Sequence, residues 1–141
     1  MAITTAMCTS FKKELMTATH NFSVGGSNMR MALFDSTATM DATTTVYSTA
    51  NQVVGTGYAA GGKPLTNIDP ATSGTTAFAD FDDVVWTGAT FSARGAQIFN
   101  NSAGNASVSV HDFGTTVSVV SGNLTVSFPT ANATAAILRL A

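Results

Sequence analysis

Residues 107–128 read SVSVHDFGTTVSVVSGNLTVSF, and this stretch decides the fold class. Apolar and polar side chains alternate cleanly over Ser107–Asp112 and again over Leu124–Phe128. Since successive side chains of a β-strand point to opposite faces, this alternation is typical of half-buried strands. Thr116–Val120 is also rich in β-branched residues, and Ser121-Gly122-Asn123 predicts a hairpin turn that pairs it with the strand that follows.

Strand patterns continue on the N-terminal side of this stretch and at the C-terminal end. They are Met29–Phe34, Thr43–Ser48, Thr76–Trp86, Thr90–Asn100 and Ala136–Leu140. About eight strands spaced roughly 8–15 residues apart are typical of an antiparallel sandwich or barrel. We therefore expect an all-β, jelly-roll-like antiparallel β-sandwich, a single domain over residues 1–141 with strands from about 29 to 140. Val53–Ser73 carries four glycines and two prolines and is expected to be a long loop with one short strand near Leu65.

One α-helix is predicted before the strands, over about residues 6–20. Its apolar stripe consists of side chains at helical spacing: Met7, Phe11, Leu15, Ala18 and Phe22. Either Thr5 or Thr9 could cap the start of this helix, and Gly25-Gly26-Ser27-Asn28 ends it. The full fold prediction is thus a β-sandwich with one N-terminal α-helix.

Charge is scarce in this chain, and this bears on its partners. Asp, Glu, Lys and Arg make up 10% of the 141 residues, against roughly 25% in an ordinary domain, and the formal net charge is −2. Thr and Ser fit the outer face of a sheet and replace charged residues there. Because weakly charged surfaces tend to associate, we expect this surface to be covered by neighbours in an assembly.

The composition argues against several functional classes. The six basic residues are dispersed apart from Lys12-Lys13, whereas nucleic-acid binding needs a clustered basic face. No run approaches the roughly 18 apolar residues of a membrane span. The N-terminus lacks the pattern of a signal peptide, so we expect a product made in the cytoplasm. A single cysteine, Cys8, excludes an intrachain disulfide and a multi-cysteine metal site.

Two motifs resemble binding sites but lack a required feature. Gly57–Lys63 fits the first seven positions of the phosphate-binding loop GxxxxGK, but Pro64 stands where that loop needs Ser or Thr to hold Mg²⁺. We therefore expect a flexible surface loop there. Asp80, Asp82 and Asp83 form the acidic cluster of the sequence, and strand alternation puts Asp83 on the opposite face from the other two. A solvated strand end is favoured over a calcium site.

The candidate catalytic side chains do not form a catalytic set. His20 and His111 are the two histidines, and Asp112 follows the second of them on a strand. Adjacent strand residues face opposite ways, so they cannot act as a histidine–carboxylate pair. Cys8 lies next to the apolar stripe of the helix and is interpreted as a structural thiol. We predict no enzyme activity, no catalytic residue, no metal site and no cofactor.

The candidate interface residues come from two parts of the sequence. Three arginines lie in the middle of predicted strands, and each is either a surface side chain that extends into solvent or an interface residue that pairs with a carboxylate. The sequence leaves both interpretations open. Residues 2–5 are uncharged and too few to form an element, so they either fray or lie along a neighbour as an added strand. The candidates are Ala2, Ile3, Thr4, Thr5, Arg30, Arg94 and Arg139.

Five segments resemble a group of small bacteriophage virion proteins. They are MAITTAMCTSFKKEL at residues 1–15, ALF at 32–34, GTGYAAGG at 55–62, WTGATFSARGA at 86–96 and AILRL at 136–140. These segments fall in order along nearly the whole chain. The chain is similar to the capsid cement (decoration) proteins of tailed phages.

The resemblance implies a jelly-roll sandwich on the outside of the virion head, present as dimers over contacts between major capsid subunits. The implied partners are the major capsid protein and a second copy of the chain. The alternative is a carbohydrate-binding or adhesion module on a tail or fibre, because sandwiches commonly serve as lectins. A lectin is expected to group exposed aromatic residues, whereas Tyr47, Tyr58 and Trp86 are scattered in sequence, which favours the structural role.

Overall fold

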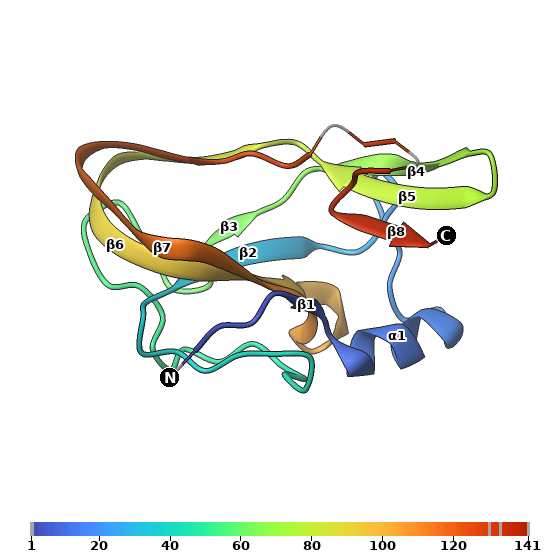
Figure 1. Ribbon diagram of the computed structural model, residues 1–141, viewed down its shortest axis with the longest axis horizontal. Helices are drawn as coiled ribbons and strands as arrows, with labels where there is room; N and C mark the ends of the chain where they lie inside the picture. The colour runs from blue at the N-terminus through green and yellow to red at the C-terminus, as the bar shows by residue number, and fades with distance from the viewer. Residues whose placement is uncertain (1, 130, 133, 141) are drawn as a thin grey trace.

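The computed structural model describes residues 2–129, 131–132 and 134–140, and over these residues it contains two antiparallel sheets packed together (Figure 1). The strand order is β1-β7-β6-β2-β3 in one sheet and β4-β5-β8 in the other. The elements are β1 (Ala6–Met7), α1 (Thr9–Met16), β2 (Met29–Phe34), β3 (Lys63–Pro64), β4 (Asn67–Ser73), β5 (Thr76–Phe81), β6 (Val84–Asn100), the 3₁₀ turn η1 (Asn101–Ala103), β7 (Ala106–Val126) and β8 (Leu138–Leu140). This confirms the predicted all-β sandwich with one N-terminal α-helix.

One long hairpin, made of β6 and β7, builds most of the sandwich. The two strands pair from Val84↔Val126 at one end to Asn100↔Ala106 beside the connecting turn. Four register shifts interrupt this pairing, and such bulges bend a strand and increase its twist. Figure 1 shows the hairpin folding back on itself, so that its two halves lie in different layers. We call residues 84–93 and 117–126 the distal half and residues 95–100 and 106–112 the proximal half.

The bend between the two halves requires a glycine. Ala93 pairs with Val117 and Gly95 pairs with Asp112, so one residue of β6 faces residues 113–116 of β7. A Cβ atom added at Gly95 would lie 2.5 Å from the carbonyl oxygen of His111 and 2.7 Å from Ile3 Cδ1. Both distances are too short for a carbon atom, and therefore only glycine lets the strands approach this closely at the corner.

The hairpin predicted across Ser121-Gly122-Asn123 is wrong, because β7 continues through these residues. Ser121 has a positive φ of 47°, which kinks the strand without reversing it. Both segments expected to pair with each other pair instead with β6, as Val119 does with Phe91 and Leu124 with Trp86. A partner strand of 17 residues offers ladder positions along the whole distal half, and this non-local pairing overrides the local turn preference.

The core lies between the layers and joins the helix to both of them. Its largest fully buried side chains include Trp86, Phe11, Phe81 and Phe99. A chain of aromatic contacts runs from Phe11 to Phe22 at 5.8 Å between ring centroids, on to Phe81 at 6.1 Å, and then to Phe128 at 5.8 Å. Edge-to-face and tilted pairs of this kind add to the stabilisation that comes from area burial.

The helix is shorter than the predicted span of 6–20. It covers Thr9–Met16, because Ala6 and Met7 pair with Val110 and Ser109 of β7 and so belong to a strand. Cys8 is the N-cap residue and makes no side-chain capping bond, so neither threonine caps the start. The helix ends before Ala18, whose positive φ of 58° is incompatible with continuation. Two members of the apolar stripe, Met7 and Phe22, therefore reach the core from outside the helix.

Three other predicted segments differ from the structure. Thr43–Ser48 forms only an isolated bridge, between Val46 and Ala106, and its first residues belong to a turn in which the Thr44 amide donates to the Asp41 carbonyl. The predicted strand Thr76–Trp86 is divided at residues 82–83 into β5 and the start of β6. The predicted long loop contains the short strand expected near Leu65, which is β3 at residues 63–64, and in addition the strand β4 at residues 67–73. The strand predicted at Ala136–Leu140 is present over Leu138–Leu140.

Candidate interaction surface

Residues 2–5 are docked on their own chain. Ile3 is a core residue at 6% exposure, and its neighbours bond to Met40: the Thr4 amide donates to the Met40 carbonyl at 2.8 Å, and the Met40 amide donates to the Ala2 carbonyl at 3.1 Å. The side chain of Ile3 fills the space above Gly95. The expectation that these residues fray or lie along a neighbour as an added strand is therefore corrected for Ile3, which packs into its own chain, while Ala2 and Thr4 remain exposed.

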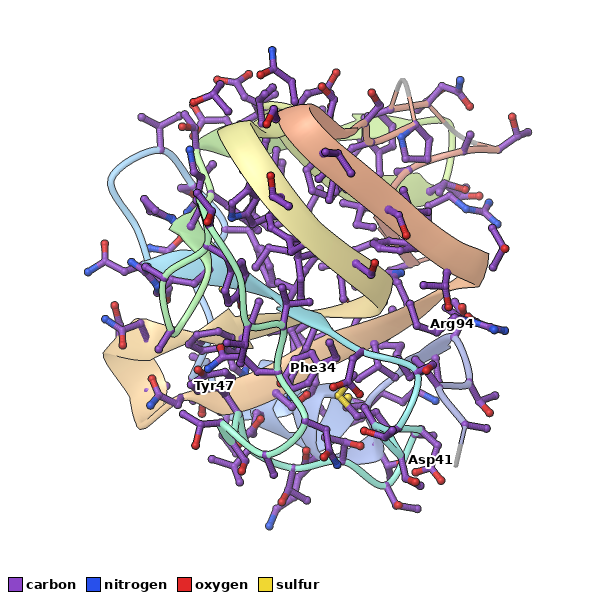
Figure 2. The ribbon with its side chains drawn as sticks, turned by 90° about the vertical axis from the view of Figure 1, so that its left-hand side faces the viewer. Phe34, Asp41, Tyr47 and Arg94 are labelled. Atoms are coloured by element: carbon purple, nitrogen blue, oxygen red, sulfur yellow. The ribbon has the colours of Figure 1, made fainter. Side chains whose placement is uncertain are left out.

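Thr5 and Arg94 are brought together by Asp112. The Arg94 guanidinium donates to Asp112 through Nε at 2.7 Å and through a terminal nitrogen at 3.4 Å, and the Asp112 backbone amide donates to Thr5 Oγ1 at 2.8 Å. The hydrogen bond from Arg94 lowers the pKa of the Asp112 carboxyl. Figure 2 shows Arg94 at the rim of the bent end of the hairpin. These contacts secure the corner between the distal and proximal halves.

Arg30 binds the loop that contains Gly61 and Gly62. Its Nε donates to the Gly61 carbonyl at 3.1 Å and its terminal nitrogen to the Gly62 carbonyl at 3.0 Å. A Cβ added at Gly62 would lie 1.8 Å from the Met31 carbonyl oxygen, so this loop lies directly against β2. Close packing against β2 thus explains Gly62, and the positive φ of 88° explains Gly61, so neither glycine needs a phosphate-binding role.

Gln52 also binds this loop. The Gln52 Oε1 atom accepts hydrogen bonds from the hydroxyls of Tyr47 at 2.8 Å and Tyr58 at 3.1 Å, and from the Gly61 amide at 3.0 Å. Burial raises the pKa of Tyr58 to about 12. Tyr47 also lies next to Phe34, with ring centroids 6.4 Å apart (Figure 2). The predicted flexible loop is therefore tied to the sandwich by several buried or half-buried bonds.

Arg139 lies in a different sheet from Arg30 and Arg94. It is an exposed residue of β8 and pairs in register with Phe78 of β5. It borders an apolar groove of about 120 Å³ between the helix and this sheet, which Phe11, Leu15 and Leu138 also line. The seven candidate interface residues thus do not form one site: residues 2–5 and Arg94 gather at the corner, and the other two arginines lie elsewhere.

The residues considered for chemistry are engaged inside the fold. Cys8 is fully buried with its Sγ 3.2 Å from Ser107 Oγ, and burial raises the pKa of this thiol. His20 lies between Glu14, at 3.0 Å from Nε2, and Asn100, whose Nδ2 is 2.9 Å from Nδ1. These contacts link the helix and the following loop to β6 and β7.

His111 is placed apart from the other histidine. Its Nε2 lies 2.9 Å from Ser109 Oγ on the same strand, and burial lowers the pKa of His111 to about 4. The imidazole is therefore neutral near pH 7. Asp80 and the exposed Asp82 and Asp83 lie around the connection from β5 to β6, where the Asp83 carboxylate accepts a bond from the Phe128 amide at 2.9 Å. Over the described residues, no group of three or more His, Cys, Asp or Glu side chains could hold a metal ion.

Sequence reasoning missed the distal half of the long hairpin as a surface. Its exposed positions are all uncharged: Thr87, Gly88, Thr90 and Ser92 on β6, and Ser118, Val120, Ser121, Asn123 and Thr125 on β7. Two of these serines face each other across the strands, with 2.7 Å between the Ser92 and Ser118 hydroxyl oxygens. The signal in the sequence is the run without charge from Phe113 to Phe128, most of which the local pattern predicts to be a separate hairpin.

One edge of this surface is open. Among the described residues, no bridge or backbone hydrogen bond joins residues 113–126 of β7 to any strand except β6. Beneath this edge lies a hollow lined by Phe113, Val117, Leu124, Thr125, Val126 and Ser127. Several of these side chains are only partly buried, although they pack against the core. The sandwich therefore exposes both backbone groups and apolar side chains along one strand.

Comparison with known proteins identifies no relative. No family model matches the chain, and neither a curated protein nor a solved structure matches it. In the part of the chain that the structure describes, no helix is long and apolar enough to cross a membrane.

Proposed function

We propose that this chain is a non-enzymatic virion structural protein that binds the outside of a phage capsid and stabilises contacts between major capsid subunits. Its partners would be the major capsid protein and a second copy of itself. The resemblance of five ordered sequence segments to capsid cement proteins supports this proposal, as does the sandwich fold with one N-terminal helix.

The observation that carries the proposal is the uncharged outer surface of the distal half. A protein that binds a shell repeats each contact many times, so excess like charge on the contact face would accumulate over neighbouring copies. Nine exposed positions without a charged side chain avoid this repulsion. Their hydroxyl, amide and backbone groups can still bond to a neighbouring surface.

The internal use of charge fits the same role. Arg94 and Asp112 pair with each other at the corner, and Arg30 bonds to the carbonyls of its own loop. These contacts hold three of the charged groups within the chain and stiffen the sandwich. A stiff scaffold loses little conformational freedom when it attaches to a shell, which favours binding.

The aromatic side chains give no support to the alternative of a carbohydrate-binding or adhesion module. Trp86 is 1% exposed and stacks with Tyr58 at 6.3 Å between centroids. Tyr47 stacks with Phe99 at 4.3 Å. These rings pack within the chain and do not form an exposed platform for a sugar, so we retain glycan binding only as an outcome of the test.

The test uses phage heads prepared without this protein and then incubated with the purified chain. We expect the wild-type chain to bind the heads and raise their rupture temperature, because a ligand that binds only the assembled lattice stabilises it by mass action. Heads that rupture at the same temperature with and without bound protein would contradict the proposal. Binding to a glycan array without binding to heads would favour the adhesion module instead.

Two charge variants identify the binding face. Thr87→Glu puts a carboxylate on the exposed distal half, and Met16→Glu puts the same charge on α1, where Met16 is 89% exposed. Since burying an unpaired charge is costly, we expect Thr87→Glu to weaken binding to heads at least about tenfold. Met16→Glu should bind as the wild type does. Equal loss in both variants would show that net charge, and not this face, controls binding.

A further inference from the structure

The free edge of β7 lacks the protection that the terminal strands of the two sheets have. Native edge strands avoid pairing with foreign strands by being short or by carrying charges and prolines. Among the described strands, β1 has two residues, β3 consists of Lys63-Pro64, β4 contains Asp69-Pro70, and β8 carries Arg139. Residues 113–126 of β7 contain neither a charge nor a proline. This long edge is therefore suited to accept another strand.

The side chains along this edge also lack a cover. Val119, Leu124 and Val126 point to the core side of the distal half and are partly buried. Leu124 and Val126 also line the hollow along this strand. A strand added to β7 would satisfy the free backbone groups and cover these apolar side chains at once. Both effects favour the addition of a strand over solvent exposure.

The sequence of the edge fits a second copy of itself. Residues 114–122 read GTTVSVVSG, which has nearly the same pattern in both directions around Ser118. In an antiparallel pair related by a two-fold axis through Ser118, Val117 of one copy would oppose Val119 of the other, and Thr116 would oppose Val120. Both of these pairs join two β-branched side chains, which are favourable partners across strands. Because the segment has no charge, nothing in it repels its copy.

We propose that two copies of this chain pair edge to edge through residues 116–120 of β7, in antiparallel register about a two-fold axis at Ser118. The distal halves of the two hairpins then form one continuous sheet, and the uncharged surfaces of both copies lie on the same side of it. The inference deepens the proposed function and rests on it for the role of the dimer. The dimer itself is tested on the isolated chain.

The experiment measures the mass of the purified chain by sedimentation over a range of concentrations. We expect the wild type to be a dimer. Ser118→Lys places two ammonium groups opposite each other on the axis, and juxtaposed like charges should raise the dimer dissociation constant at least about tenfold. Thr125→Lys is the matched control, because it adds the same charge to an exposed position of β7 outside the paired segment. Circular dichroism confirms that both variants fold.

A cross-linking arm tests the register. In Ser118→Cys the two introduced thiols face each other across the axis, and oxidation should join the copies through a disulfide. Thr125→Cys should not form this link, and the native Cys8 is fully buried. A wild-type chain that stays monomeric, or a dimer that is unaffected by Ser118→Lys and forms no 118–118 disulfide, would overturn the inference. A dimer with these properties that does not bind heads would contradict the proposed function alone.

Discussion

Replacing His111 is expected to change the acid stability of the protein. In the folded chain this imidazole lies beside Ser109 in the proximal half of β7. Burial lowers the pKa of His111 to about 4, against 6.5 for a free histidine. The unfolded chain therefore takes up a proton at a higher pH than the folded chain. Stability from this group is fully present above pH 6.5, falls as the pH drops, and is lost below about pH 4.

The size of the effect follows from the two pKa values. At about 1.36 kcal/mol for each pH unit between 6.5 and about 4, full titration removes roughly 3 kcal/mol of unfolding free energy. This is a large fraction of the free energy of unfolding of a typical domain, which is roughly 5–15 kcal/mol. We therefore expect the wild-type chain to lose much of its stability on mild acidification.

The assay compares urea unfolding of the wild type and His111→Gln from about pH 7.5 to about pH 4. The variant has no titrating group at this position, so its stability should fall less steeply over this range. Asp112 also has a lowered pKa and loses its contribution in acid, but it is present in both proteins and cancels in the difference. If the difference in unfolding free energy between the two proteins stays constant from about pH 7.5 to about pH 4, the lowered pKa of His111 is refuted.

Three further predictions concern stability and are checked by chemical denaturation. Gly62→Ala should lower the free energy of unfolding by about 3 kcal/mol or more, because the new Cβ would lie 1.8 Å from a backbone oxygen. Gly74→Ala has a similar positive φ and open space, so it should lower this free energy by only about 1 kcal/mol. Equal losses in the two variants would exclude close packing as the cause. Gln52→Leu should lower the free energy of unfolding by roughly 1–3 kcal/mol, since two tyrosine hydroxyls and one amide lose their acceptor. An unchanged stability would show that water replaces the lost acceptor. Ile3→Ala should lower the free energy of unfolding by about 2–4 kcal/mol, whereas Thr4→Ala, at an exposed position, should lower it by well under 1 kcal/mol. An Ile3→Ala variant as stable as the wild type would mean that Ile3 is not part of the core.

The sequence predicts the low charge of the candidate surface, but not the free edge of β7. The scarcity of charge, and hence a surface suited to assembly, follows from composition alone. The free edge of β7 does not, because Ser121-Gly122-Asn123 has the residues of a turn and becomes a kink only when β6 is present to pair on both sides of it. The positions of Arg30 and Arg94 could likewise not be assigned, since their acceptors lie 18 or more residues away in the chain.

The sequence by itself determined the class of the protein. Alternation with period two, as in Ser107–Asp112, is a local property of the chain, and it needs only a buried and an exposed face to produce strands. The tertiary structure decided which strands pair, that Ala6 and Met7 leave the helix for β7, and that Ile3 is buried. These outcomes depend on contacts between residues far apart in sequence, such as Ile3 against Gly95, and no local pattern contains that information.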